Sequence, residues 1–301
     1  MTMSAAQSVF DGVAPEVGAF ARMLAERNLV DLAGRDRKAG GGFCTSFPTY
    51  GLPFIFANFN GTTLDVNVLL HETGPAFQVF SSRGESVSDY LSPTLESCEI
   101  HSMSMEFLTW PYLDAFFGVD AQRYRRQHLS TSLLFLPYGA AVDEFQHRMY
   151  EQPDLTPAQR HAIWKDLEKT YLPWRTSGGI GHVELGGAWQ QQRHIYLMPF
   201  YYTDYALAMC CALQFWSKSL DDQKDATASY LRLCERGGEE PFQSRAHCRL
   251  AISISIGRSA RRRGPRADGS GAVGMAKVAF FCAGVFGSGF VEAMRGLVRK
   301  T

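Results

Sequence analysis

His71 and Glu72 are adjacent within residues 64–83, a stretch that reads as a helix in spite of Pro75 in its middle. Two histidines one helical turn apart can bind the same zinc ion, and a glutamate directly after the first can polarise the attacking water. Here the second histidine position is Pro75, so the string reads HETGP. A lone His–Glu pair also fits an ordinary solvated helix face, and the metal-site interpretation therefore depends on other residues.

Two carboxylates follow on a second predicted helix, residues 93–110. Glu99 comes 28 residues after His71, and a carboxylate on a second helix often completes a His/His/Glu zinc site. Glu106 lies two turns further along the same face, where it could orient a ligating histidine. His101 faces another direction from Glu99, so we do not expect it to replace the missing ligand. Taken alone, both glutamates also fit a helix surface.

Residues 194–208 combine one histidine with several tyrosines in the string HIYLMPFYYTDYALA. Tyr202 and Tyr205 are three residues apart, so on a helix their hydroxyls can point the same way and donate to an oxyanion. His194 opens the same short stretch. The alternative interpretation of this stretch is an aromatic core helix.

The elements that would position these residues are mainly helical. Residues 53–59, within PFIFANFNG, are the best strand candidate, and the glycine-rich residues 39–51 before them predict turns. The remaining predicted helices are residues 14–33, 119–151, 156–172 and 200–233. Thr156 is suited to cap the helix 156–172. The expected fold class is therefore mainly α with a small β element.

Four strings carry a resemblance to a known family: AGGGFCTSFPTYGLPFIFANFNGT, DVNVLLHETGPAFQVFSSR, SPTLESCEIHSMSMEFLTWP and HIYLMPFYYTDYALAMCCALQFW. In this order they resemble the oligoendopeptidase F-type branch of the thimet-oligopeptidase-like zinc metallopeptidases. The resemblance runs from near the N-terminus to about residue 242. It implies a helical zinc-peptidase region with a deep channel that admits short peptides, one bound zinc ion and hydrolysis of oligopeptides.

The resemblance also implies roles for individual residues. It makes His71 and Glu99 metal ligands, and Glu106 the carboxylate that supports a ligand. The implied catalytic residues are Glu72 as general base, with His194, Tyr202 and Tyr205 contacting substrate and stabilising the tetrahedral intermediate. The strand 53–59 corresponds to the one along which peptides pair by β-strand addition, so Phe56, Ala57 and Asn58 are the implied substrate-binding residues.

Pro75 departs from the family pattern and bears on activity. It removes one of three protein ligands and, inside a helix, costs about 3 kcal/mol. We therefore expect weak or absent zinc binding and an impaired metalloendopeptidase. The alternative is a catalytically inactive remnant that acts at most as a peptide-binding module.

Length and the C-terminal sequence are two further departures. Family members are roughly twice as long, and the resemblance starts midway through them, so the family's N-terminal half is absent here. We expect apolar surface of the half-channel to be exposed and to favour self-association, unless a separate chain supplies the missing half. The expected organisation is a metallopeptidase catalytic-domain fragment, residues 1–242, and a divergent basic, Gly/Arg-rich tail, residues 243–301.

Composition sets the remaining expectations. The net charge is zero, yet residues 245–301 hold eleven Lys or Arg against two acids and the preceding residues are acidic. No nucleic-acid-binding fold accompanies those arginines, so we expect no nucleic-acid partner. The apolar run 278–291 would span about 21 Å as a helix, short of the roughly 30 Å bilayer core. Seven cysteines without a CxxC pair and no apparent signal peptide favour a cytoplasmic protein.

Overall fold

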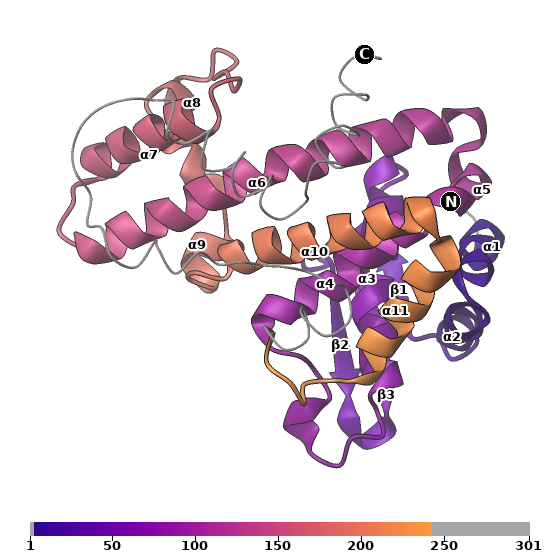
Figure 1. Ribbon diagram of the computed structural model, residues 1–301. Helices are drawn as coiled ribbons and strands as arrows, with labels where there is room; N and C mark the ends of the chain where they lie inside the picture. The colour runs from indigo at the N-terminus through magenta and orange to yellow at the C-terminus, as the bar shows by residue number, and fades with distance from the viewer. Residues whose placement is uncertain (1–2, 243–301) are drawn as a thin grey trace. The chain divides into compact units, whose positions relative to one another are not determined.

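The computed structural model describes residues 3–242 (Figure 1). These residues form two compact units. The first unit comprises residues 3–129 and 208–242, and the second comprises residues 130–207. Helices α6 (Ala121–Glu151) and α10 (Tyr202–Asp221) each begin in one unit and end in the other. The predicted mainly helical class with a small β element is confirmed.

The first unit contains a three-stranded sheet in the order β1-β3-β2. Strands β1 (Val30–Ala33), β2 (Phe43–Phe47) and β3 (Leu52–Phe59) are short, and β3 lies in the centre. It pairs with β1 in parallel and with β2 in antiparallel register. Ile55 and Ala57 of β3 are fully buried, as expected for the inward-facing positions of a strand with one face on the core.

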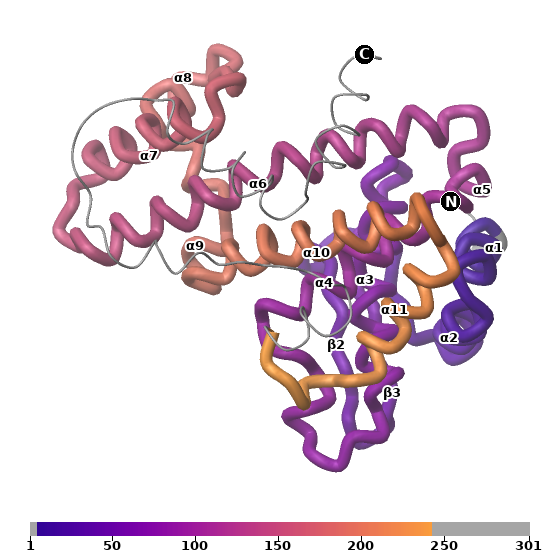
Figure 2. Tube along the Cα trace, viewed as in Figure 1, coloured from indigo at the N-terminus to yellow at the C-terminus, as the bar shows by residue number. Residues whose placement is uncertain are grey.

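The first unit also contains most of the described helices. They are α1 (Met3–Val13), α2 (Pro15–Glu26), α3 (Thr63–Ser81), α4 (Leu95–Leu108), α5 (Asp114–Phe117) and α11 (Gln223–Glu235), with the first turns of α6 and the end of α10. The chain passes from α3 to α4 through residues 82–94, a path that can be followed in Figure 2. The α3 helix packs against β3, β2 and α4, so it links the sheet to the helical layer.

Helix α3 continues through Pro75 without a break. A proline there removes one backbone hydrogen bond, but residues on both sides, Leu70 and Ala76, are fully buried and hold the helix in place. Gly74 allows α3 and α4 to approach closely, because a Cβ atom at this position would lie 2.3 Å from the carbonyl oxygen of His101. The helix predicted for residues 64–83 is therefore confirmed in spite of its proline.

Helices are the only regular elements among the described residues of the second unit. It contains most of α6, α7 (Pro157–Tyr171), α8 (Gly181–Glu184), α9 (His194–Leu197) and the first turns of α10. Its core is aromatic, with the Trp164 ring edge-on to Phe145 at 5.4 Å between centroids. Thr156 caps α7, and with Gln159 it forms a reciprocal capping box, which confirms the predicted helix start.

Two element predictions were wrong at their ends. The single helix expected over residues 14–33 is α2 followed by β1, because the chain turns at Asn28, which has a positive φ of 53°. The single helix expected over residues 200–233 is α10 followed by α11, and Asp222 caps the second of these. The turn-rich residues 39–51 also contain β2, and α1 was not anticipated.

The predicted boundary at residue 242 and the predictions for residues 257–274 and 278–291 concern residues 243–301, which lie outside the described residues. Among residues 3–242, no helix combines the length and apolar character needed to cross a bilayer.

Candidate metal centre

His71 lies midway along α3 and faces two carboxylates of α4. Its Nε2 atom is 3.1 Å from Oε2 of Glu99, and its Nδ1 atom is 2.6 Å from Oε1 of Glu106. The two glutamates are seven residues apart, so two helical turns bring both to the face that packs on α3. The structure therefore brings together three of the residues that the sequence pointed to.

Glu106 has a second histidine partner that the sequence analysis missed. Nε2 of His128, in the first turns of α6, is 2.5 Å from Oε2 of Glu106. One turn earlier on α6, the Tyr124 hydroxyl donates a hydrogen bond to Asn67 of α3. The spacing of Tyr124 and His128, four residues apart on a predicted helix, is the sequence signal that could have indicated a polar face directed at the site.

The ionisation of Glu106 and His71 follows from these contacts. Burial alone would raise the pKa of Glu106, but the hydrogen bonds from His128 and His71 lower it to about 2. Burial alone would lower the pKa of His71, but the carboxylates of Glu106 and Glu99 raise it well above its usual value. In the metal-free chain His71 is therefore an imidazolium held between two carboxylates.

Glu72 occupies the opposite side of this group, next to the sheet. Burial raises the pKa of its carboxyl to about 7, although the positive charge of His71 and the backbone N–H of Cys44 act in the other direction. The chain at Gly42 passes close to it, because a Cβ atom there would lie 3.7 Å from Oε1 of Glu72. A carboxyl with a pKa near neutrality can both accept and return a proton, as a general base must.

A catalytic zinc ion usually has three protein ligands. The 3.1 Å between Nε2 of His71 and Oε2 of Glu99 is close to the roughly 3.4 Å that separates two ligands of one tetrahedral zinc. Pro75, one turn after His71 on α3, offers no donor atom to the same ion. Across residues 3–242, no three His, Cys, Asp or Glu side chains form a metal-binding group. The residues present thus supply two ligands and do not complete a catalytic zinc site.

His194, Tyr202 and Tyr205 form a cluster within the second unit. The Tyr205 hydroxyl is 3.5 Å from Nε2 of His194, and the centroids of the His194 and Tyr202 rings are 5.3 Å apart. Burial raises the pKa of the Tyr202 hydroxyl above its usual value, so this group remains a proton donor at neutral pH. The three side chains that the sequence grouped are therefore neighbours, and they belong to a different unit from His71.

The sheet order limits where a peptide strand could add to residues 53–59. On one side β1 pairs with β3 from Ile55 to Phe59, and on the other side β2 pairs with it only from Leu52 to Phe56. Peptide addition at this strand stays a prediction. The outer edge of β2 pairs with no strand among the described residues.

The three residues of β3 that were expected to bind substrate each contact the loop before β2. The ammonium group of Lys38 lies 4.4 Å from the centroid of the Phe56 ring and donates to the carbonyl oxygen of Ala57 at 2.5 Å. The Asn58 amide donates to the backbone of the preceding loop, at Ala39 and Gly41. These contacts brace the loop before β2.

His101 lies apart from the centre, as expected. Its Nδ1 atom is 3.5 Å from Sγ of Cys234, and its carbonyl oxygen accepts a hydrogen bond from the Tyr230 hydroxyl. Both partners belong to α11, so the His101 side chain is part of the core between α4 and α11.

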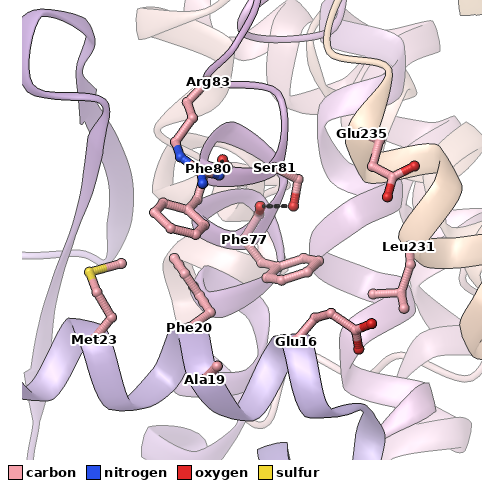
Figure 3. Close-up of a pocket in the computed structure, with 10 residues that line it drawn as sticks. All are labelled: Glu16, Ala19, Phe20, Met23, Phe77, Phe80, Ser81, Arg83, Leu231 and Glu235. Atoms are coloured by element: carbon pink, nitrogen blue, oxygen red, sulfur yellow. Dashed lines mark hydrogen bonds between the residues drawn. The ribbon is translucent and has the colours of Figure 1, made fainter.

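A separate cavity of about 410 Å³ lies in the first unit (Figure 3). Its wall comes from α2, α3 with the turn after it, and α11, and consists of Glu16, Ala19, Phe20, Met23, Phe77, Phe80, Ser81, Arg83, Leu231 and Glu235. None of the candidate site residues belongs to this wall, so the cavity is not part of the metal centre.

Comparison with known proteins decides the family. The sequence profile of peptidase family M3 matches residues 8–244, which is most of the chain and all of the site residues. The chain belongs to this family. M3 peptidases depend on zinc. Membership of this family relates the arrangement of His71, Glu72 and Glu99 to a zinc site. No curated protein sequence matches closely enough to add a named relative.

Solved structures agree with the M3 assignment. A crystal structure described as an oligoendopeptidase F is 47% identical with a TM-score of 0.79, and PZ peptidase A with an inhibitor is 44% identical with a TM-score of 0.79. An oligoendopeptidase F from Bacillus anthracis str. Ames is 38% identical with a TM-score of 0.72. Each alignment covers 94% of this chain and 48%, 49% and 46% of the other chain, respectively. The chain therefore spans about half the length of the structures that it matches.

Proposed function

We propose that this M3-family chain binds oligopeptides and hydrolyses them poorly, because Pro75 replaces one of the ligands that a catalytic zinc ion requires. One observation carries the proposal. His71 and Glu99 keep a 3.1 Å separation suited to a shared metal ion, while the position one turn after His71 has no donor atom. Two protein ligands leave the ion held mainly by water, and loss of a direct ligand should weaken binding by more than the 10–100-fold typical of a lost supporting group.

The remaining residues supply the acid–base and binding parts of peptide hydrolysis. Glu72, with a pKa of about 7, is suited to take a proton from an attacking water and to return it to the leaving amine. The hydroxyls of Tyr202 and Tyr205 are suited to donate hydrogen bonds to an oxyanion, with His194 beside them. These roles follow the family resemblance.

The outer edge of β2 is the proposed place for the peptide backbone. The backbone N–H of Cys44 in β2 bonds to the Glu72 carboxyl, so a peptide paired along β2 would lie beside the general base. Exposed Phe43 and Phe47 on the same strand offer apolar surface for side chains of the peptide. Because backbone pairing does not depend on side chains, binding would tolerate different peptide sequences.

The test measures zinc content after gel filtration for the unmodified chain, Pro75→His and Pro75→Ala. We expect substoichiometric zinc in the unmodified chain and close to one zinc per chain in Pro75→His. Pro75→Ala repairs the helix without adding a ligand, so it should remain low in zinc. One tightly bound zinc per unmodified chain would overturn the proposal. Equal zinc in all three forms would show that position 75 is not a ligand position.

A second candidate function is peptide binding without hydrolysis, and the open edge of β2 favours it. Fluorescence anisotropy of a labelled oligopeptide measures binding, and cleavage of an internally quenched oligopeptide measures hydrolysis. Binding that weakens when the backbone amides of the probe are methylated, with no cleavage even in zinc-loaded Pro75→His, would favour the second candidate. Cleavage by Pro75→His that is lost on adding Glu72→Gln would favour the first.

A further inference from the structure

The hydrogen bond between Trp110 and His128 fixes which nitrogen of His128 carries a proton. Nε1 of Trp110 lies 3.1 Å from Nδ1 of His128. An indole N–H can only donate, so Nδ1 of His128 must accept and is unprotonated. The single proton of this neutral imidazole is then on Nε2, which lies 2.5 Å from Oε2 of Glu106. His128 is therefore a neutral donor to Glu106.

The same logic continues from Glu106 to His71. Oε2 of Glu106 already accepts from His128, and its other oxygen, Oε1, lies 2.6 Å from Nδ1 of His71, so Nδ1 of His71 is the donor in this second hydrogen bond. With Nδ1 committed in this way, Nε2 is the ring nitrogen left to face Glu99. A histidine that ligates through Nε2 needs this arrangement, since the other ring N–H fixes the ring's orientation.

We propose that Trp110 and His128 are positioning residues that hold Glu106 and, through it, orient His71 with Nε2 directed at Glu99. The side chain of His128 is 5% exposed and that of Glu106 is 8% exposed, so water does not compete for these bonds. The role in metal binding rests on the proposed function, whereas the fixed tautomer of His128 does not.

Local sequence explains why Trp110 reaches this place. Helix α4 ends at Leu108, and Pro111 follows two residues after the C-cap, where the chain cannot continue as an α-helix. The next residues form the short turn η3 (Trp110–Tyr112), and the indole packs against the His128 ring at 5.7 Å between centroids. Phe107 and Tyr124 lie against the same imidazole, at 4.8 and 5.9 Å.

This aromatic surround makes phenylalanine an informative replacement. His128→Phe keeps an aromatic ring among Phe107, Trp110 and Tyr124 but removes both hydrogen bonds. His128→Gln can still donate to Glu106. His147, on the same helix with a side chain that is 60% exposed, offers the matched control His147→Phe.

The first measurement is the imidazole ¹⁵N spectrum of the full, metal-free chain at neutral pH. The chain has eight histidines, and the signal of His128 is the one that disappears in His128→Phe. We expect His128 to carry one proton, on Nε2. Trp110→Phe removes the donor to Nδ1 while Nε2 still donates to Glu106, so the Nδ1 signal should move away from that of an unprotonated nitrogen that accepts a hydrogen bond. A proton on Nδ1 of His128 in the unmodified chain, or a spectrum unchanged by Trp110→Phe, would overturn the proposal.

The second measurement is zinc affinity by chelator competition in the Pro75→His background. We expect His128→Phe to weaken zinc binding about tenfold, His128→Gln to recover part of the loss, and His147→Phe to change nothing. Unchanged affinity in His128→Phe would refute the link to the metal ligand. If Pro75→His itself holds no zinc, the proposed function fails, and the ¹⁵N spectra still decide whether His128 is fixed as we propose.

Discussion

Glu106 is the residue on which the stability of this centre should depend most. Its carboxylate accepts hydrogen bonds from both His71 and His128, and its pKa is lowered from 4.5 to about 2. Glu106→Gln keeps the shape but replaces one acceptor oxygen with an NH₂ group, which then faces an imidazole N–H. The substitution removes the charge and leaves one buried donor without an acceptor.

The expected loss follows from the pKa. A carboxyl whose pKa is about 2.5 units lower in the folded chain than in the unfolded chain contributes about 3 kcal/mol to the free energy of unfolding at pH 7. This contribution is fully present above the unfolded pKa near 4.5 and is lost as the pH falls through the folded pKa near 2. At pH 3 less than half of this contribution should remain.

The assay is urea denaturation of the metal-free chain and Glu106→Gln at pH 7 and at pH 3. Glu96→Gln is the matched control, because Glu96 is on the same helix and no side-chain partner is seen for it among residues 3–242. The Glu96→Gln substitution should change the free energy of unfolding by less than about 1 kcal/mol. A loss below about 1 kcal/mol in Glu106→Gln at pH 7, or a loss that does not shrink at pH 3, would refute the reasoning.

Two further substitutions test the packing and the charge of the same centre. Gly74→Ala should lower the free energy of unfolding by at least about 2 kcal/mol, because its Cβ would overlap the His101 carbonyl, whereas Gly84→Ala, with no atom within 4 Å, should change it by less than about 0.5 kcal/mol. The pKa of Glu72 is about 7 in the folded chain, so the Glu72 carboxyl makes the folded state less stable as the pH rises from 4.5 to 7. Glu72→Gln should therefore stabilise the metal-free chain by about 3 kcal/mol at pH 8 and hardly at pH 4. Equal urea midpoints for the two glycine variants, or a Glu72→Gln effect independent of pH, would contradict these expectations.

The raised pKa of Glu72 and the lowered pKa of Glu106 show how one helix pair can set two carboxyls to opposite states. Glu106 has two N–H donors within 2.6 Å, so burial strengthens its bonds. Glu72 is buried with fewer donors and near other carboxylates, so burial favours its neutral form. The hydrogen-bonded Glu106 carboxylate stabilises the fold. The Glu72 carboxyl lowers the stability of the fold at neutral pH and above, but it can exchange a proton there.

The sequence by itself indicated the family, the helical class and three residues of the centre, His71, Glu99 and Glu106. These depend on local order: the HETGP string, the seven-residue spacing of Glu99 and Glu106, and the apolar β3 segment are all legible within 20 residues. Helix α7 was also predictable, because its cap at Thr156 is a contact between residues three positions apart. Where spacing along one element decides the outcome, the sequence is enough.

Only the tertiary structure decided the partners that come from distant elements. His128 reaches Glu106 across 22 residues, and no spacing rule links two helices separated by a turn of unknown direction. The sheet order likewise placed β3 between β1 and β2, so β3 pairs with a strand on each side, while β1 and β2 are the edge strands. Strand propensity predicts that a segment pairs, but the edge that stays open for a peptide depends on which other segments pair with it.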